Sequence, residues 1–309
     1  MAASAPAAAR LRRGFDRLVP ATPAGFATLS LALVGVMWLN IASGALVRVT
    51  GSGLGCPDWP LCEGRPVPPL AGHAVIEFSN RLIALVAIVM ALLAYAAARR
   101  VSDRAGRALA LTIGLGTLGQ APLGALTVLF DLHPVLVMTH FLVAIVVAGL
   151  SALLWARADV VAAGQRDAAG RPRWLPALAL VTCALAFALI VSGALSTASG
   201  PHAGGEDIRR IGNLSDATYL HVRVATAWIV SIAAFAWALA LGPWRPSRAS
   251  PLLTGLVLLV PAQAVIGEVQ WRTQLPWGLV LAHVAIAGAL WLTTVALVAR
   301  VRLAPARGD

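Results

Sequence analysis

The sequence has few charged residues, no lysine and only three cysteines. Charged residues occupy 12% of its 309 positions and hydrophobic residues 59%, a balance that excludes an ordinary soluble fold of this length. With three cysteines, the chain can form at most one internal disulfide. The mean hydropathy of +0.81 indicates an integral membrane protein instead.

Apolar segments long enough to cross a bilayer recur along the chain. A helix of about 20 residues spans the hydrocarbon core, and lipid offers unpaired backbone groups no other partner. We therefore predict an all-α integral membrane protein with eight transmembrane helices. Their expected ranges are 26–48, 74–98, 108–129, 135–156, 175–196, 219–241, 252–271 and 277–299.

Arginine is distributed unevenly between the segments that join these spans. In a soluble protein the net charge of +11 would suggest nucleic acid as a partner. Here 17 of the 24 basic residues fall on one side: Arg10, Arg12, Arg13, Arg17, Arg99, Arg100, Arg104, Arg107, Arg157, Arg166, Arg171, Arg173, Arg245, Arg248, Arg300, Arg302 and Arg307. The positive-inside rule makes this side cytoplasmic. We predict a multi-pass protein of the cell membrane with both termini in the cytoplasm, in contact with lipid and not with nucleic acid.

Two motifs occur twice in the sequence. Residues 120–124 and His140 share Gln, Ala, Gly and His with residues 263–267 and His283, at one offset of 143 residues (His140 to His283). Ser-Gly-Ala-Leu occurs at 43–46 and again at 192–195. Chance similarity between Gly- and Ala-rich helices is the alternative to a duplication.

A duplication with four spans in each half has a definite geometry. Four is an even number, so both halves enter the membrane in the same orientation, and the repeat is parallel. We predict two pseudo-symmetric four-helix bundles. The expected parts are a cytoplasmic tail at 1–25, an N-terminal half at 26–156, a cytoplasmic linker at 157–173, a C-terminal half at 174–299 and a cytoplasmic tail at 300–309.

Four of the six histidines fall at one depth, on the outer side of the predicted membrane. They are His73, His140, His221 and His283, whereas His133 and His202 fall in outer loops and are expected to be solvated. Neutral imidazole is a common axial ligand of heme iron, and facing helices of a bundle can each supply one. We predict that His221 and His283 bind one heme. A histidine that only hydrogen-bonds a neighbouring helix is the alternative.

The second span carries a polar stripe on an apolar helix. His73, Glu77 and Asn80 are spaced i, i+4 and i+7, which places them on one face. A carboxylate at membrane depth is costly unless it is paired or used. Glu77 is therefore a candidate acid or base at the mouth of a pocket, and pairing with Arg81 is the structural alternative.

Three arginines near the outer surface are candidates for binding heme propionates. Arg48, Arg81 and Arg223 could each form bidentate charge-assisted hydrogen bonds with a carboxylate. They could equally be residues that extend their charge to the membrane interface.

The outer loop after the first span contains Cys56 and Cys62. Two cysteines so close together can form a small disulfide. A metal site or a redox-active pair are the alternatives, and no nearby histidine completes a tetrahedral metal site.

Taken together, these residues resemble the heme A synthase family of cytochrome oxidase assembly enzymes. The shared motifs are Thr50-Gly51-Ser52-Gly53-Leu54, Pro57-Asp58-Trp59-Pro60 with Cys62, Glu77 with Arg81, Gln120 to Gly124, Thr127-Val128, Pro134 with His140, and His221 with His283. The resemblance covers residues 26–299. It implies oxidation of a ring methyl of heme O to the formyl group of heme A, through successive hydroxylations.

The resemblance also implies a role for each site residue. His221 and His283 would ligate a heme b in the C-terminal half, and His140 would ligate the iron of the substrate heme. Glu77 would serve proton or cation-stabilising chemistry near the reacting methyl, and Cys56 and Cys62 would be linked. Heme O synthase and oxidase assembly factors would be the protein partners.

The chain departs from the family pattern at one position. The usual motif is Glu-x-x-His-Arg, and here Asn80 stands where the histidine is expected. Either His73 replaces this ligand with the heme shifted outward, or the substrate heme is five-coordinate through His140. Two other functions compete with a heme A synthase: a non-catalytic bis-His diheme electron carrier, and a transporter with a histidine proton relay.

Overall fold

The computed structural model describes residues 19–68, 72–164, 172, 174–203, 209–242 and 249–303. Within these residues it contains eight long α-helices and one short 3₁₀ helix. They are α2 (Pro23–Val49), η1 (Ser52–Leu54), α3 (Gly72–Val101), α4 (Arg104–Leu129), α5 (Pro134–Ala162), α6 (Trp174–Ser199), α7 (Leu214–Leu241), α8 (Ala249–Arg272) and α9 (Trp277–Leu303). Ten of the arginines predicted to lie on the cytoplasmic side are outside the described residues. They are those at positions 10, 12, 13, 17, 166, 171, 173, 245, 248 and 307.

All eight predicted spans are confirmed, and each lies inside one long helix. The eight helices are long and apolar enough to cross a membrane, so the protein is an integral membrane protein. Several helices begin before the apolar segment, because a polar residue caps the first turn. Asp103, for example, accepts a hydrogen bond from the backbone N–H of Gly106 at 2.8 Å.

Small side chains allow the helices of the bundle to pack closely and bury their contact faces. Alanines 87, 91, 94 and 98 lie along one buried face of α3, and small residues let membrane helices approach closely. Helices α4 and α8 contain Pro122 and Pro261 and yet continue through them without interruption.

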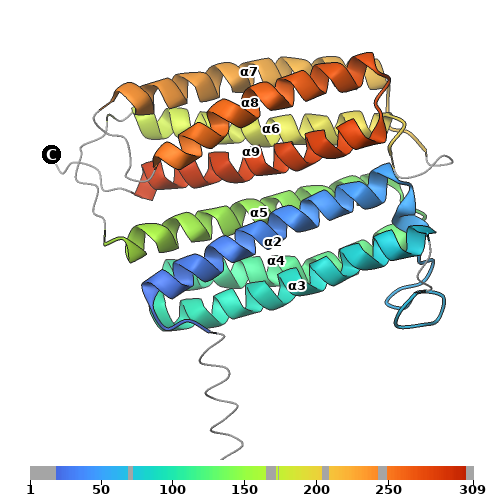
Figure 1. The fold of residues 1–309 in the computed structure, drawn as a ribbon, viewed down its shortest axis with the longest axis horizontal. Helices are drawn as coiled ribbons and strands as arrows, with labels where there is room; N and C mark the ends of the chain where they lie inside the picture. The colour runs from blue at the N-terminus through green and yellow to red at the C-terminus, as the bar shows by residue number, and fades with distance from the viewer. Residues whose placement is uncertain are drawn as a thin grey trace, which may run out of the picture.

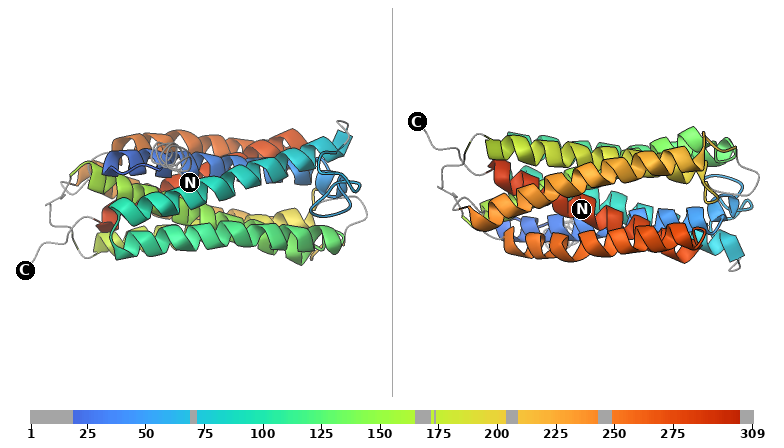
Figure 2. Two further views of the ribbon diagram at one scale, coloured as in Figure 1. Left: turned by 90° about the horizontal axis from the view of Figure 1, so that it is seen from below. Right: turned by 90° about the horizontal axis from the view of Figure 1, so that it is seen from above.

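The helices form two groups of four that follow the chain order, and all run along one common direction (Figures 1 and 2). In the first group α2 packs on α3 and α5, and α4 packs on α3 and α5. In the second group α6 packs on α7 and α9, and α8 packs on α9. Contacts of α9 with α2 and α5, and of α5 with α6, join the groups. Helices α3 and α5 therefore occupy opposite corners of the first group, as α7 and α9 do around α6 in the second.

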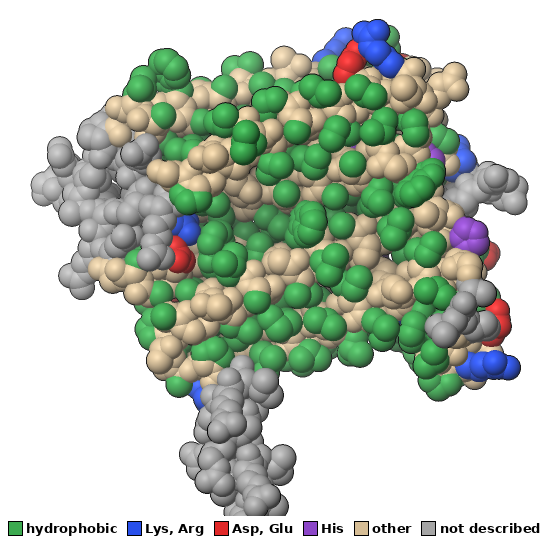
Figure 3. Space-filling view, viewed as in Figure 1, with side chains coloured by type: hydrophobic (Ala, Val, Ile, Leu, Met, Phe, Trp, Pro, Cys, Tyr) green, Lys and Arg blue, Asp and Glu red, His purple; other side chains and the backbone are tan. Residues whose placement is uncertain are grey.

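The two ends of the bundle differ. Helix α2 begins and α9 ends at the same end, whereas η1 and the loop after it lie at the opposite end (Figure 1). In the space-filling view, hydrophobic side chains cover the middle of the visible face and charged side chains gather near its two ends (Figure 3). This is the distribution that a bilayer around the middle of the bundle requires.

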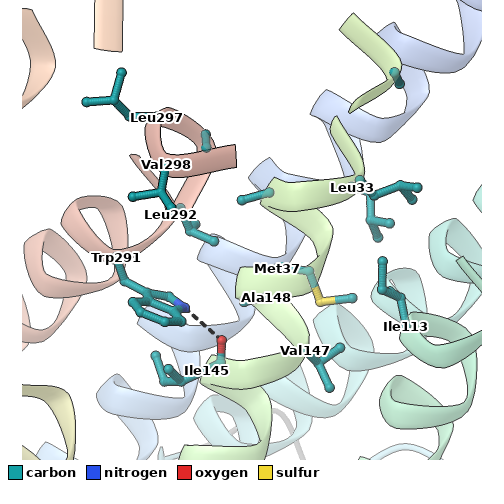
Figure 4. Packing of buried hydrophobic residues seen from close by; sticks show 14 of the residues in the cluster. Leu33, Met37, Ile113, Ile145, Val147, Ala148, Trp291, Leu292, Leu297 and Val298 are labelled. Carbon is teal, nitrogen blue, oxygen red and sulfur yellow. Dashed lines mark hydrogen bonds between the residues drawn. The ribbon is translucent and has the colours of Figure 1, made fainter. Parts of the chain in front are cut away.

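A tryptophan on α9 binds the two groups of helices together. Trp291 Nε1 donates a hydrogen bond to the backbone oxygen of Ile145 on α5 at 2.9 Å (Figure 4). Both residues belong to a buried hydrophobic cluster that also contains Met37, Ala148 and Leu292. A methyl group at Gly149 would come within 2.8 Å of the indole. A glycine is therefore needed at this position of α5 for the indole to pack against the helix.

Candidate functional site

A large cavity lies within the second group of helices. Its volume is about 550 Å³, within the range of small-molecule sites, and side chains from α2 and α5 to α9 line it. Most of the lining is apolar, and the imidazoles of His221 and His283 contribute to it. The cavity thus combines room for a ligand with two potential metal-binding groups.

His221 on α7 and His283 on α9 face each other at the separation that one metal requires. Their ring centroids are 6.3 Å apart. A metal held between two imidazoles would place the ring centres about 6 Å apart, because each N–metal bond is about 2.0 Å long and each ring adds about 1 Å. The rings are inclined at 63°, in an edge-to-face arrangement.

A serine fixes the tautomer of His221. Ser192 Oγ donates to the backbone oxygen of Leu189 at 2.9 Å and lies 3.0 Å from His221 Nδ1. Because the hydroxyl has one hydrogen, it accepts from the Nδ1–H of His221. Nε2 of His221 then carries the free lone pair, as a metal ligand must.

The residues around His283 come from the duplicated motif on α8. Gln263 Nε2 donates to the backbone oxygen of His283 at 3.0 Å, and a methyl group at Gly267 would lie 3.1 Å from the imidazole Cε1. The backbone of α8 at Gly267 therefore packs against the ring. Within the described residues, the buried His283 Nδ1 has no hydrogen-bond partner.

An arginine from the first group of helices reaches this cavity. Arg48, at the end of α2, donates from Nε to the backbone oxygen of His202 at 3.0 Å, and both residues line the cavity. Its Nη2 is buried and has no hydrogen-bond partner among the described residues. A guanidinium group with Nη2 left in this state beside an apolar cavity is suited to the carboxylate of a ligand.

The first group of helices holds His140 in a similar setting. A methyl group at Gly124 on α4 would lie 3.4 Å from His140 Cε1. Within the described part of the chain, His140 Nδ1 and both amide atoms of Gln120 are buried without a hydrogen-bond partner. Buried polar groups are almost always paired, so these atoms also favour a site for a polar or metal-containing ligand.

Glu77 and Arg81 anchor the outer loop to α3. Arg81 Nη2 lies 2.5 Å from Glu77 Oε1, and Glu77 Oε2 accepts the backbone N–H of Cys56 at 2.8 Å. Arg81 also donates to the backbone oxygen of Leu61 at 2.9 Å. The pairing with Arg81 that the sequence offered as an alternative is therefore present, and Glu77, which is only 5% exposed, uses both carboxylate oxygens.

The outer loop is closed by covalent and polar links. Cys56 and Cys62 form a disulfide. Asp58 accepts hydrogen bonds from the backbone N–H groups of Glu63 at 2.6 Å and Gly64 at 2.8 Å. These bonds, that from Gly64 most of all, lower the pKa of Asp58 below its usual range.

The match that decides the family extends over most of the chain. Residues 26–295 match COX15-CtaA, the family described as cytochrome oxidase assembly protein. The chain belongs to this family. Heme A synthases are among the similar proteins: that of Bacillus pumilus is 38% identical over 117 residues, which is 37% of this chain and 38% of the relative.

Further members of the COX15-CtaA family show comparable similarity. The heme A synthase of Symbiobacterium thermophilum is 36% identical over 129 residues, 40% of this chain and 42% of that protein. The heme A synthase of Rhodopseudomonas palustris is 31% identical over 155 residues, 46% of this chain and 42% of that protein. Each of these alignments spans about two fifths of the length of the relative.

In this COX15-CtaA protein the three arginines that were candidates for binding heme propionates lie at three separate places. Arg48 reaches the cavity of the second group, and Arg81 holds the outer loop. Arg223 lies exposed on α7 and is absent from the lining of the described cavity. Among the three, Arg48 has the surroundings expected of a residue that binds a propionate.

The structure separates the three polar residues of the α3 stripe. His73 is exposed at the outer end, where its Nδ1 lies 2.8 Å from Ser52 Oγ. Glu77 binds the outer loop, and Asn80 accepts a hydrogen bond from Ser43 on α2 at 2.7 Å. The three share one face of the helix but have different neighbours.

One cavity residue was missed at the sequence level. The expectation that His202 is solvated is wrong, because its Nε2 lies 2.7 Å from the backbone oxygen of Leu275 and its side chain is partly buried. No periodicity marks a residue in a long outer loop, so the sequence contained no signal for this contact.

Proposed function

We propose that this chain is a heme A synthase that oxidises a ring methyl of heme O to the formyl group of heme A. Its family membership over residues 26–295, together with relatives named heme A synthase, carries the proposal. The methyl would first become a hydroxymethyl and then a gem-diol, which loses water. Each of the two oxidations takes its oxygen atom from one water molecule, releases two protons and passes two electrons to an external acceptor.

The C-terminal half, 174–299, is proposed to hold a resident heme b. The separation of His221 and His283 suits one iron between them, and the tautomer fixed by Ser192 suits ligation through Nε2. Arg48 would bind a propionate at the outer edge of the cavity. A heme bound here would supply electron transfer, while the apolar lining would exclude water.

The N-terminal half, 26–156, is proposed to bind the substrate heme through His140. Glu77 would lie one turn further out than Asn80 on α3, at the outer edge of this site. Its negative charge, oriented by Arg81 and by the N–H of Cys56, would stabilise positive charge or accept a proton near the reacting methyl. Loss of that charge should therefore affect product formation more than heme binding.

The proposed arrangement in the cell follows from the arginine distribution. The two halves would be related as a parallel repeat, with 1–25, 157–173 and 300–309 in the cytoplasm and the disulfide loop outside the cell membrane. Heme O synthase would supply the substrate, and oxidase assembly factors would receive the product. Fusion of a reporter active only in the cytoplasm to either terminus tests this topology.

Extraction and chromatography of the hemes bound to the purified protein test the function. In cells that make heme O, we expect heme B together with heme O and heme A. Heme B alone would instead indicate a diheme electron carrier, and the absence of heme would indicate the transporter alternative.

Three variants separate the proposed roles of the halves. Glu77→Ala should abolish heme A while heme b remains bound, and Glu77→Gln, which keeps the size and the hydrogen-bond acceptor, tests whether the charge itself is needed. His283→Met should change or remove the heme b spectrum. Unchanged product from Glu77→Ala would refute the catalytic role of Glu77.

A further inference from the structure

Each histidine of the proposed heme sites packs against a glycine of a neighbouring helix. Added methyl groups at Gly124, Gly193 and Gly267 would lie 3.4, 3.0 and 3.1 Å from Cε1 of His140, His221 and His283, in that order. A fourth glycine, Gly44 on α2, has Asn80 Oδ1 as its neighbour, at 3.8 Å from an added methyl. Asn80 thus completes a set of four like contacts, three of which involve an imidazole.

A serine next to the glycine strengthens the correspondence between Asn80 and His221. Ser192 Oγ contacts His221 Nδ1 at 3.0 Å and donates to the carbonyl three residues before it at 2.9 Å. Ser43 Oγ contacts Asn80 Oδ1 at 2.7 Å and lies 3.1 Å from the carbonyl three residues before it. Both serines open a Ser-Gly-Ala-Leu motif. In the first group of helices, Asn80 therefore occupies the place that His221 occupies in the second.

An asparagine in this place cannot repeat the chemistry of the histidine. Its side chain is shorter than imidazole, and it has no ring nitrogen with a lone pair for iron. In the described residues its Oδ1 is bonded to Ser43, and no partner is found for its amino group. The opposite corner of the same four helices carries His140 on α5. Both amide atoms of Gln120 on α4 are buried without a partner in the part of the chain that the structure describes.

His73 has another position and another partner. It lies seven residues before Asn80, which is about 10 Å along a helix axis. Its ring is exposed and contacts Ser52 of the outer loop at 2.8 Å. The contacts of His73 therefore tie it to the outer loop at the end of α3, away from the level of Gly44 and Asn80.

We propose that His140 is the one protein ligand to the iron of the heme in the N-terminal half, and that Asn80 faces an open sixth position. This position would accept a small molecule such as carbon monoxide, oxygen or water, and the amide would be within reach to interact with it. The inference rests on the proposed function only in that a heme occupies this half. A heme held by both His221 and His283 would have no position left for such a molecule.

Carbon monoxide is the probe for the open position. The full-length protein, purified with its hemes and supplemented with hemin to two per chain, is reduced and exposed to carbon monoxide. We expect one of the two hemes to bind it and to be high-spin before it binds. Failure to take up a second heme, or two low-spin hemes that do not react, would overturn the inference.

Three variants identify the residues responsible. Asn80→His should add the second imidazole, convert the N-terminal heme to low spin and abolish carbon monoxide binding. Asn80→Ala is the control in case Asn80→His does not fold. It should still bind carbon monoxide, but the C–O stretching frequency of the bound molecule should shift because the amide dipole is lost. An unshifted frequency would overturn the placement of Asn80 at the sixth position.

His73→Ala tests the alternative that His73 is the second ligand to the iron of the N-terminal heme. It should leave the spin state and carbon monoxide binding unchanged, and a gain of carbon monoxide binding would show that His73 is the ligand and refute the inference. Heme extraction from the same samples tests the proposed function separately. Heme A without carbon monoxide binding would overturn only the open position, and carbon monoxide binding without heme A would overturn only the synthase activity.

Discussion

Replacement of Gly193 by alanine should disturb the proposed heme b site through one displaced ring. The added methyl would lie 3.0 Å from Cε1 of His221, and ordinary contact begins at 3.4 Å, so the ring must move by about 0.4 Å. Metal–ligand distances in genuine sites agree within about 0.2 Å. The displacement exceeds this tolerance unless α6 and α7 move apart to make room for the added methyl group.

The expected size of the effect follows from overpacking. Extra methyl groups in a packed interior cost about 1–3 kcal/mol, and about 1.4 kcal/mol is a tenfold change in affinity. We expect Gly193→Ala to bind heme b roughly 5- to 150-fold more weakly and to have altered electron paramagnetic resonance of the bis-His iron. Heme titration and low-temperature spectra of the purified protein measure both.

The equivalent glycine of the N-terminal half is the matched control. A methyl at Gly124 would lie 3.4 Å from His140 Cε1, which is ordinary contact. Both substitutions gain about 1 kcal/mol of helix propensity, so that gain cancels in the comparison. Wild-type heme b affinity and spectrum in Gly193→Ala, or equal damage to the N-terminal heme in Gly124→Ala, would refute the reasoning.

Three further predictions concern the outer loop and the contact between the halves. Arg81→Gln should loosen the outer loop and increase its cleavage in limited proteolysis, because the donor to several loop carbonyls is lost. Asp58 has a lowered pKa, so its contribution to loop stability is present above the unfolded value of about 3.9 and is lost as the pH falls through the folded value. Protection of the Gly64 amide from hydrogen exchange, corrected for the intrinsic rate, should therefore decrease at acid pH, and Asp58→Asn should abolish this dependence. Trp291→Phe removes the hydrogen bond to α5 and should lower the free energy of unfolding by about 1 kcal/mol, as measured by denaturant unfolding. Trp237 is exposed, so Trp237→Phe is the control. A smaller loss of stability in Trp291→Phe than in the control would contradict the assigned role.

The spans could be predicted from the sequence because each depends on a local property. A stretch such as 175–196 must be helical in lipid whatever its neighbours do, since its backbone groups have no other partner there. The disulfide was one of the open possibilities for the same local reason, since Cys56 and Cys62 are too near in sequence to avoid each other in a compact loop. The duplicated motifs also pointed to His140, His221 and His283 as a related set.

The roles of individual polar residues could not be predicted in this way. Arg48, Arg81 and Arg223 have equivalent positions near the ends of spans, yet one reaches the cavity of the other half, one holds a loop and one is exposed. The difference depends on how each helix is rotated about its axis and on which helix faces it. The position of an arginine along its span does not report which helix or loop will face it.

The sequence by itself determined that the chain crosses a membrane as helices and that its two halves carry matched motifs. Only the tertiary structure decided that the rings of His221 and His283 lie with their centroids 6.3 Å apart, that Glu77 is engaged by the outer loop, and that Asn80 contacts Ser43. Membrane insertion depends on the transfer of each segment into lipid, which is a sum over neighbouring residues. A site between helices depends on contacts between residues more than a hundred positions apart, and those distances are set when the helices pack.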